Sequence, residues 1–322
     1  MDIRNFGNTD IKTSAVVFGG GFVGGILIDA DDDTRRTAIR MALDGGVSWI
    51  DTAPMYGQGQ SEEAIGWLLK EVQESPTIST KVNLDTTRLD DIAGQVEESI
   101  TTSLRLLDRD AVDVVHLHNC ITSTTEGRNL AVERVLGPGG ALEALEAARD
   151  QGLTRYIGIT ALGDSACCTE VIKTGRVQSA QVYYNMINSS AALGGGHGLS
   201  GQSFAGLLEA CKTHGVGTMG IRVFAAGILA TDGRHGREII ITDNTDVLSE
   251  EARARKAFAK LGISGTADTP YGTRAETALR YVLGEPMIDC AIVGLAELDH
   301  LRQVLKAAAA GPLPQGAMDL LR

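Results

Sequence analysis

Positive charge, cysteine and long apolar runs are all scarce in this sequence. The 322 residues contain 29 Lys and Arg against 41 Asp and Glu, a net charge of −12. This balance argues against a nucleic-acid or anionic-membrane partner, because either needs a basic face. The five cysteines are odd in number and irregularly spaced, which does not predict a disulfide framework and favours a reducing compartment.

Two further absences bear on where the protein works. The sequence has no run of about 18 apolar residues, so we expect no membrane-spanning segment. The start, MDIRNFGNTDIK, places charges early and has no apolar region of the kind found in signal peptides. We therefore expect a soluble protein of the cytoplasm.

What is present is a regular alternation of two patterns. Short β-branched runs occupy eight places along the chain: 13–20, 47–51, 77–81, 112–118, 154–160, 177–184, 216–223 and 288–294. Helical patterns with apolar residues at spacings of three and four lie between them. The strand runs are nearly all apolar, as expected for parallel strands covered on both faces. Eight such β-then-α units predict a single α/β domain over 1–322, a (β/α)8 TIM barrel.

Additions to this plan are also predicted. Residues 3–12 indicate an N-terminal β-hairpin that turns at GNTD and plugs one end of the barrel. Long loops follow the fourth and seventh strands, at 119–140 and 225–265. The alternative is a Rossmann-like sheet, suggested by the glycines of GGGFVGG at 19–25. We disfavour it because the next helix is expected only near Asp31, too late for that motif.

Ionisable residues stand at the ends of three consecutive predicted strands. Asp51 ends the second strand, Lys81 the third and His118 the fourth, and Tyr56 follows Asp51 in a loop. Singly, each has an ordinary structural explanation, such as a cap, a rim lysine or a core histidine. Together they would allow a phenol to exchange a proton near neutral pH. A phenol has an ordinary pKa of about 10, and an adjacent ammonium held by a carboxylate favours its ionised form.

These residues carry a resemblance to the aldo-keto reductase family. The resemblance lies in the stretches DTAPMYGQGQSEEAIG, TKV and VHLHN. They are similar to the family's Asp-Tyr-Lys-His tetrad at Asp51, Tyr56, Lys81 and His118. The resemblance extends from RNFGNTDIKTS to the last strand and helix. It implies an oxidoreductase in which Tyr56 is the general acid or base and Lys81 tunes it. Asp51 would anchor Lys81, and His118 would position the substrate oxygen.

The resemblance also implies a nicotinamide cofactor bound without a Rossmann fold. Gln181 matches the glutamine that binds the carboxamide. Thr160 and Ala161 stand where the family usually has Ser-Asn, so only the hydroxyl of Thr160 remains. Ile221 replaces a stacking aromatic residue, and Arg222 next to it would pair with the pyrophosphate.

Two other segments complete the expected cofactor site. Gly227 and Leu229 match the segment that wraps the pyrophosphate. After the last strand, Gly294 and Glu297 stand where NADP-preferring relatives place basic residues, and Arg302 comes one helical turn later. A carboxylate near the ribose suits a free 2′-hydroxyl. We therefore expect NAD or NADP as cofactor, with NAD favoured.

Aromatic residues make up only 4% of the chain, which does not favour a large apolar pocket. We expect a small polar carbonyl or sugar substrate near Phe22, Met55 and Asn119. By resemblance to the D-threo-aldose and L-fucose dehydrogenase branch, we expect NAD-linked oxidation of an aldose at C1. The alternative within the family is an NADPH-dependent aldehyde or ketone reductase of broad specificity.

Readings of other classes stay open. The chain could be a nicotinamide-binding regulatory module with little turnover, or an aldolase that uses Lys81 as a Schiff base. A metal-dependent hydrolase would use His116 and His118, but no second histidine pair appears at another strand end, so we expect no metal. The sequence allows a monomer or a homo-oligomer.

Overall fold

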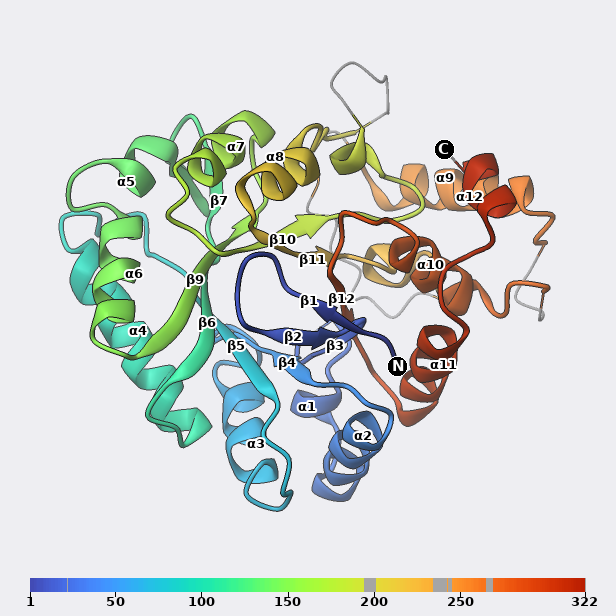
Figure 1. Ribbon diagram of the computed structural model, residues 1–322, viewed down its shortest axis with the longest axis horizontal. Helices are drawn as coiled ribbons and strands as arrows, with labels where there is room; N and C mark the ends of the chain where they lie inside the picture. The colour runs from blue at the N-terminus through green and yellow to red at the C-terminus, as the bar shows by residue number, and fades with distance from the viewer. Residues whose placement is uncertain (22, 194–200, 234–241, 243–244, 265–268, 322) are drawn as a thin grey trace.

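A computed structural model of the chain describes residues 1–321 apart from 22, 194–200, 234–241, 243–244 and 265–268. Eight parallel strands close into a barrel (Figure 1). They are β3 (Val16–Gly19), β4 (Trp49–Asp51), β5 (Thr77–Val82), β6 (Val112–Leu117), β9 (Thr154–Ala161), β10 (Ser179–Tyr183), β11 (Gly217–Ile221) and β12 (Cys290–Gly294). Closure occurs where β12 pairs with β3, Ala291 opposite Val16. The predicted (β/α)8 barrel is confirmed, and the open Rossmann-like sheet is wrong.

The helices surround this barrel (Figure 1). They are α1 (Ile26–Asp29), α2 (Asp32–Asp44), α3 (Gln60–Leu68), α4 (Ile92–Leu107), α5 (Val132–Leu136), α6 (Ala141–Asp150), α7 (Ser165–Lys173), α8 (Leu207–His214), α9 (Val247–Lys260), α10 (Arg274–Leu283), α11 (Leu298–Ala310) and α12 (Gln315–Leu321). In the described ranges, no helix combines the length and apolarity that a bilayer crossing requires.

The first helix begins earlier than predicted. Asp31 does cap α2, its side chain accepting from the Thr34 amide, but the short helix α1 precedes it from Ile26. The chain is held there by the Ile26 amide, which donates to the Leu295 carbonyl at 3.0 Å. Gly24 also lies so close to Leu295 that an added Cβ would be 2.2 Å from its nitrogen. Docking against a residue far along the chain, which no local pattern reveals, therefore decides where α1 begins.

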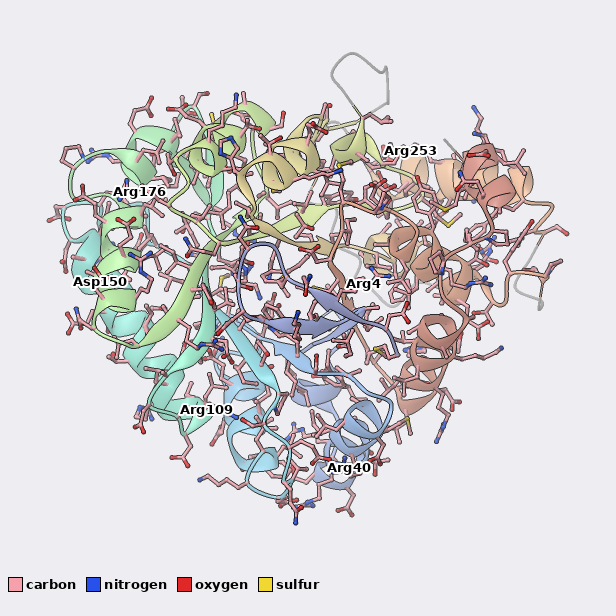
Figure 2. The ribbon with its side chains drawn as sticks, viewed as in Figure 1. Arg4, Arg40, Arg109, Asp150, Arg176 and Arg253 are labelled. Carbon is pink, nitrogen blue, oxygen red and sulfur yellow. The ribbon has the colours of Figure 1, made fainter. Side chains whose placement is uncertain are left out.

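The N-terminal hairpin covers the amino end of the barrel, as predicted. Strands β1 (Ile3–Asn5) and β2 (Lys12–Ser14) are antiparallel, and in Figure 1 they lie across the centre of the barrel. Phe6, in the turn, packs edge-on against Trp49 with ring centroids 4.8 Å apart. Figure 2 shows Arg4 near this centre and Arg40 and Arg176 at the periphery. The hairpin closes this end, so the opposite end is left for a site.

Both long loops after the fourth and seventh barrel strands contain secondary structure of their own. The first includes the short parallel strands β7 (Cys120–Thr122) and β8 (Asn129–Ala131), followed by α5. The second begins with the 3-10 turn η2 (Ala225–Gly227) and contains α9. Both leave from the carboxyl end of the barrel, so they build the walls around the strand ends that carry the predicted catalytic residues.

Candidate active site

A buried ion pair stands at the carboxyl ends of β4 and β5. The Lys81 Nζ lies 2.6 Å from the Asp51 Oδ2 and 2.7 Å from the Thr52 carbonyl oxygen. The Lys81 and Asp51 residues are 1% and 2% exposed. A buried ammonium and carboxylate are stable only when each is paired and hydrogen-bonded, and this geometry meets that condition.

The second oxygen of Asp51 is also satisfied by neighbouring strands. Its Oδ1 accepts from the Ser79 Oγ at 2.7 Å and from the Gln181 Nε2 at 2.9 Å. Ser79 lies opposite Asp51 in the sheet register and accepts in turn from the Trp49 indole at 2.9 Å. Our sequence reasoning missed Ser79. Its position two residues before Lys81 places both side chains on one face of the strand, which is a signal that could have identified it.

Tyr56 reaches this ion pair from the loop after β4. The Lys81 Nζ lies 4.8 Å from the centroid of the Tyr56 ring. The ring of His118 stands edge-on to the same tyrosine, with centroids 6.1 Å apart. Gly57 and Gly59, at φ 62° and 94°, allow the tight turn that brings the phenol back over the strand ends. The four predicted catalytic residues are thus brought together.

Burial and charge set the protonation states in this cluster. Burial opposes the charged form of Lys81, but the Asp51 carboxylate and the Tyr56 phenol outweigh it and raise the Lys81 pKa. Burial, with the charges of Lys81 and Arg128, lowers the pKa of His118 well below 6.5. Burial also lowers the pKa of His116 to about 3. Near neutral pH the ammonium of Lys81 and the neutral imidazole of His118 therefore stand beside Tyr56.

The low pKa of the buried His116 predicts that the protein loses stability in acid. Below pH 6.5 the unfolded chain protonates this histidine while the folded chain does not, so the free energy of unfolding falls as pH decreases. At pH 5 this residue lowers the free energy of unfolding by about 2 kcal/mol. We expect urea denaturation at pH 7 and pH 5 to show that His116→Gln loses less stability between the two pH values than wild type. An equal loss in both proteins would contradict the assignment.

A cavity of about 1030 Å³ opens above these groups. This volume is at the upper end of the range for small-molecule sites, and it accommodates a large ligand together with a small one. The structure places the following predicted residues on its wall: Asp51, Met55, Tyr56, His118, Thr160, Gln181, Ile221, Arg222, Gly227, Gly294 and Glu297. Lys81 lies behind this wall against Asp51. Phe22 lies outside the described residues.

Two predicted ligands do not line the cavity. Asn119, expected to bind substrate, is fully buried. Its amide accepts from the Leu84 amide at 2.8 Å and donates to the Leu84 carbonyl at 3.0 Å, so it connects two loops instead. Leu229, expected at the pyrophosphate, is also fully buried in the apolar core. In both cases the position in the sequence does not say on which side of the backbone the side chain lies.

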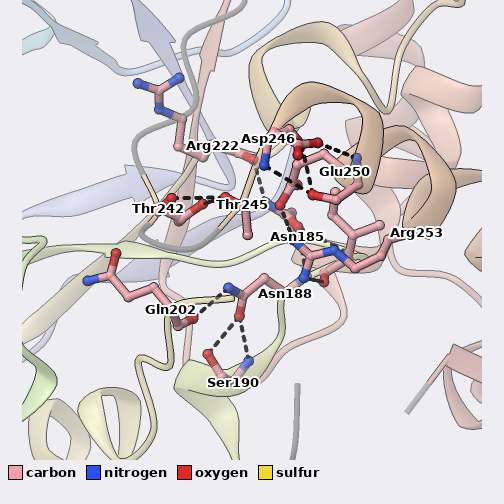
Figure 3. A network of polar contacts seen from close by, with 12 residues as sticks. Asn185, Asn188, Ser190, Gln202, Arg222, Thr242, Thr245, Asp246, Glu250 and Arg253 are labelled. Atoms are coloured by element: carbon pink, nitrogen blue, oxygen red, sulfur yellow. Dashed lines mark hydrogen bonds and ion pairs between the residues drawn. The ribbon is translucent and has the colours of Figure 1, made fainter. Parts of the chain in front are cut away.

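The segment after β11 has an unusual backbone. Arg222, Ala225 and Ala226 have positive φ, at 60°, 46° and 55°, a conformation that strains residues other than glycine. The Asn185 Nδ2 donates to the Arg222 carbonyl at 3.0 Å and helps hold this turn. Figure 3 shows Asn185 within a polar network that includes Asn188 and Arg253, while the Arg222 guanidinium points away from it.

Arg128 is a charged residue of the cavity wall that was not predicted. Arg128 lies in the loop after β6 and lines the cavity together with Tyr56 and His118. Its carbonyl accepts from the Cys120 amide at 3.2 Å, so the β7–β8 pairing places it close to the segment that follows β6 and contains His118. No sequence pattern identifies this residue, because the approach depends on the pairing of two three-residue strands.

The histidines do not indicate a metal centre. The His116 Nε2 is 2.7 Å from the Ser179 Oγ. Within the described ranges, no three His, Cys, Asp or Glu side chains gather closely enough to hold a metal ion. The arrangement is instead suited to proton transfer, since a phenol meets an ammonium and a neutral imidazole in one cavity.

Comparisons with known proteins agree with this geometry. Residues 15–322 match the model of the Aldo/keto reductase family. The chain is 27% identical over 238 residues to L-galactose dehydrogenase of Arabidopsis thaliana, covering 72% of this chain and 68% of that protein. It is 27% identical over 251 residues to D-threo-aldose 1-dehydrogenase of Pseudomonas sp, covering 69% and 70%.

A solved structure shows the same fold along the whole chain. It is the aldo-keto reductase AKR11C1 from Bacillus halodurans in its holo form. The TM-score is 0.74 at 20% identity, with 100% of this chain and 95% of that chain covered. With the family match over nearly all of the sequence and a closed barrel carrying the site at its carboxyl end, the chain belongs to the aldo/keto reductase family of NAD(P)-dependent oxidoreductases.

Proposed function

We propose that this enzyme oxidises a small sugar at C1 with NAD, and that Tyr56 is its general acid and base. The observation that carries the proposal is that the Tyr56 ring, on the wall of the cavity, lies beside both Lys81 and His118. Bound nicotinamide nucleotide would supply the hydride acceptor for oxidation, or the hydride donor for the reverse reaction.

The residues of the chain account for the proton transfer. In oxidation, the phenolate of Tyr56 takes the proton of the reacting hydroxyl, and in reduction the phenol donates a proton to the forming alkoxide. The Lys81 ammonium favours the phenolate, and the buried Asp51 holds that ammonium in place. Neutral His118 can donate its N–H to the substrate oxygen and so orient it next to Tyr56.

The cavity wall also fits a dinucleotide. Gln181 lines the cavity, where it would bind the nicotinamide carboxamide. The Thr160 Oγ1 donates to the Gln181 Oε1 at 3.4 Å, which orients the Gln181 side chain. Ile221 offers an apolar surface for the nicotinamide ring. Gly227 lines the cavity, and among the described residues no atom beyond its chain neighbours lies within 4 Å of the place where a Cβ would stand, so this glycine leaves room for a pyrophosphate. We propose these residues as the cofactor site.

The preference for NAD rests on the segment after β12. Glu297 lines the cavity just before α11, where its charge would repel a 2′-phosphate and could accept from a 2′-hydroxyl. Arg302 pairs with Asp299 on the outside of α11 and does not line the cavity. Arg274 does line it but is paired with Asp232 at 2.5 Å. His300 is a further basic group on this wall.

The sugar as substrate rests on two considerations. Two relatives with 27% identity are named as dehydrogenases of L-galactose and of a D-threo-aldose. The catalytic end of the cavity also contains few aromatic side chains beyond Tyr56 and Phe224, which favours a small polar substrate over a large apolar one.

The test is a nucleotide titration followed by a substrate panel. We expect NAD to quench or enhance tryptophan fluorescence on binding, and at least one aldose to produce reduced nicotinamide in steady-state assays. The kcat/KM with NAD should equal or exceed that with NADP. A hundredfold preference for NADP would contradict the NAD assignment. Nucleotide binding without turnover of any sugar or aldehyde would favour a regulatory module instead.

A matched variant isolates the role of Glu297. This side chain makes no capping hydrogen bond at the start of α11, so Glu297→Gln removes charge without removing a cap. We expect the ratio of kcat/KM with NADP to that with NAD to rise about tenfold, equivalent to about 1.4 kcal/mol. An unchanged ratio would show that Glu297 does not face the ribose.

A further inference from the structure

The loop that carries Tyr56 is closed by a hydrogen bond between the side chains at its two ends. The loop begins at Thr52, the first residue after β4, and ends at Ser61, in the first turn of α3. The Thr52 Oγ1 donates to the Ser61 Oγ at 2.9 Å, and both residues are fully buried. A loop of this length whose ends lie in contact is stabilised in one conformation by its own side chains.

The backbone of this loop needs such a closure. Gly57, Gln58 and Gly59 all have positive φ, at 62°, 54° and 94°, which strains Gln58 because it has a Cβ. A strained backbone persists only where the surrounding contacts fix it. The Ser61 amide donates to the Tyr56 carbonyl at 3.2 Å across this turn. Ser61 therefore contacts Tyr56 through its backbone and the start of the loop through its side chain.

The same hydrogen bond connects the loop to the ion pair of the site. The Thr52 carbonyl accepts from the Lys81 Nζ at 2.7 Å, so Lys81 and Ser61 bind two groups of one residue. The Ser61 amide binds the Tyr56 carbonyl, and the Tyr56 ring lies 4.8 Å from the Lys81 Nζ. These contacts form a closed ring. Removing the Ser61 hydroxyl opens the ring without changing any atom that contacts Lys81.

Neighbouring contacts fix the first turn of α3 against the barrel. Glu62, the residue after Ser61, is also fully buried. Its Oε1 accepts at 2.5 Å from the Oγ1 of Thr80, which precedes Lys81 on β5. Ser61 also packs against the end of β3, since an added Cβ at Gly20 would lie 2.4 Å from its Oγ. The turn is thus held against β3, β4 and β5, and Ser61 passes that constraint to the loop.

We propose that Ser61 is a positioning residue for catalysis, which holds the Tyr56 hydroxyl at the reacting oxygen by closing the loop onto Thr52. The inference rests on the proposed function, in which Tyr56 transfers the proton. Proton transfer requires the two groups to lie within hydrogen-bond reach, and a displacement of about 1 Å can lower the rate by about 100-fold. Ser61 is not among the described residues that line the cavity, so it acts through the loop and not on the substrate.

Removing either hydroxyl of the pair tests the proposal. In Ser61→Ala, and separately in Thr52→Val, we expect kcat to fall by about 10- to 100-fold while the Kd for the nucleotide stays within about threefold of wild type. Because both variants remove the same bond, the double variant should lose no more kcat than either one alone. Thr52→Ser keeps the hydroxyl and should restore most of the kcat that Thr52→Val loses. Additive losses, or a kcat within about twofold of wild type in Ser61→Ala, would overturn the inference.

Ser48 provides the matched control at the other end of β4. It precedes that strand, and its Oγ donates to the Ser14 Oγ at 3.3 Å. This is also a contact between two hydroxyl groups, but it lies beside the N-terminal hairpin, and neither residue is among the described ones that line the cavity. Ser48→Ala should lower stability in urea denaturation and leave kcat at its wild-type value. An equal loss of kcat in Ser48→Ala and Ser61→Ala would assign the effect to destabilisation of the barrel and overturn the inference.

Failure of the proposed function gives a different result. If Tyr56→Phe kept wild-type kcat, or if no substrate were turned over, the proton-transfer role of Tyr56 would be wrong regardless of Ser61. Hydrogen–deuterium exchange of the peptide 53–60 then decides the inference separately, because it follows opening of the loop and not the reaction. Faster exchange in Ser61→Ala, with no change in Ser48→Ala, would support the closure by Ser61. Equal exchange in Ser61→Ala and wild type would overturn it.

Discussion

Replacing Tyr56 with phenylalanine is expected to lower kcat by about a thousandfold, the scale of general acid–base catalysis. The substitution keeps the aromatic ring that lies next to Lys81 and His118 and removes only the hydroxyl group. Proton transfer then lacks its donor and acceptor, while the cavity keeps its shape. Steady-state kinetics on the best substrate, with nucleotide affinity from fluorescence titration, checks the result. We expect the Kd for the nucleotide to change by less than about threefold. A group that acts only in the transition state contributes to kcat and not to binding in the ground state.

A second tyrosine provides the matched control. Tyr156 lies at the opposite end of the barrel, where its hydroxyl donates to the Asp10 Oδ1 at 2.9 Å. Tyr156→Phe removes the same atom at a distance from the cavity and should leave kcat within a factor of about two. If Tyr56→Phe kept more than about a tenth of wild-type kcat, the general acid and base would have to be another group, and the mechanism would be wrong.

Breaking the buried ion pair is expected to affect both stability and catalysis. Lys81→Met leaves the Asp51 carboxylate buried with only the neutral donors of Ser79 and Gln181. Removal of one partner from such a pair costs about 3–5 kcal/mol of unfolding free energy. Catalysis should also fall by about a hundredfold, because no ammonium then favours the phenolate of Tyr56. Urea denaturation and kcat measured on the same preparation check the two effects.

The double variant separates structure from chemistry. Asp51→Asn with Lys81→Met removes both buried charges, so most of the lost stability should return. Activity should stay low, because the group that favours the phenolate is still missing. If kcat recovered together with stability, the pair would be only a structural feature of the barrel. If neither recovered, the polar neighbours Ser79 and Gln181 would be the cause of the loss.

The catalytic cluster was predictable because its members mark strand ends. A parallel strand in a barrel delivers the side chain at its carboxyl end to the same mouth as every other strand. Asp51, Lys81 and His118 each follow an apolar run in the sequence, so their convergence follows from the fold. Tyr56 comes soon after Asp51 and just before Gly57 and Gly59, which allow a tight turn, and the short connection keeps it near the mouth.

The wall of the cavity was less predictable. Asn119 stands beside His118 in the sequence, yet its amide is fully used by the backbone of Leu84. Arg128 is ten residues from His118 along the chain and still lines the same cavity. The short strands β7 and β8, of three residues each, have too little periodicity to be identified in advance. Their pairing decides which of these two side chains lines the cavity.

The sequence by itself determined the barrel, the hairpin at its amino end and the four residues that meet at its mouth. These follow from local physics, because apolar periodicity sets the strands and helices and strand polarity sets which ends converge. Only the tertiary structure decided the hydrogen-bond partners of Asp51, the position of Arg128 on the cavity wall and the strained turn at Arg222. Those features depend on contacts between residues distant in sequence, and such contacts are set by packing in three dimensions, which local pattern does not encode.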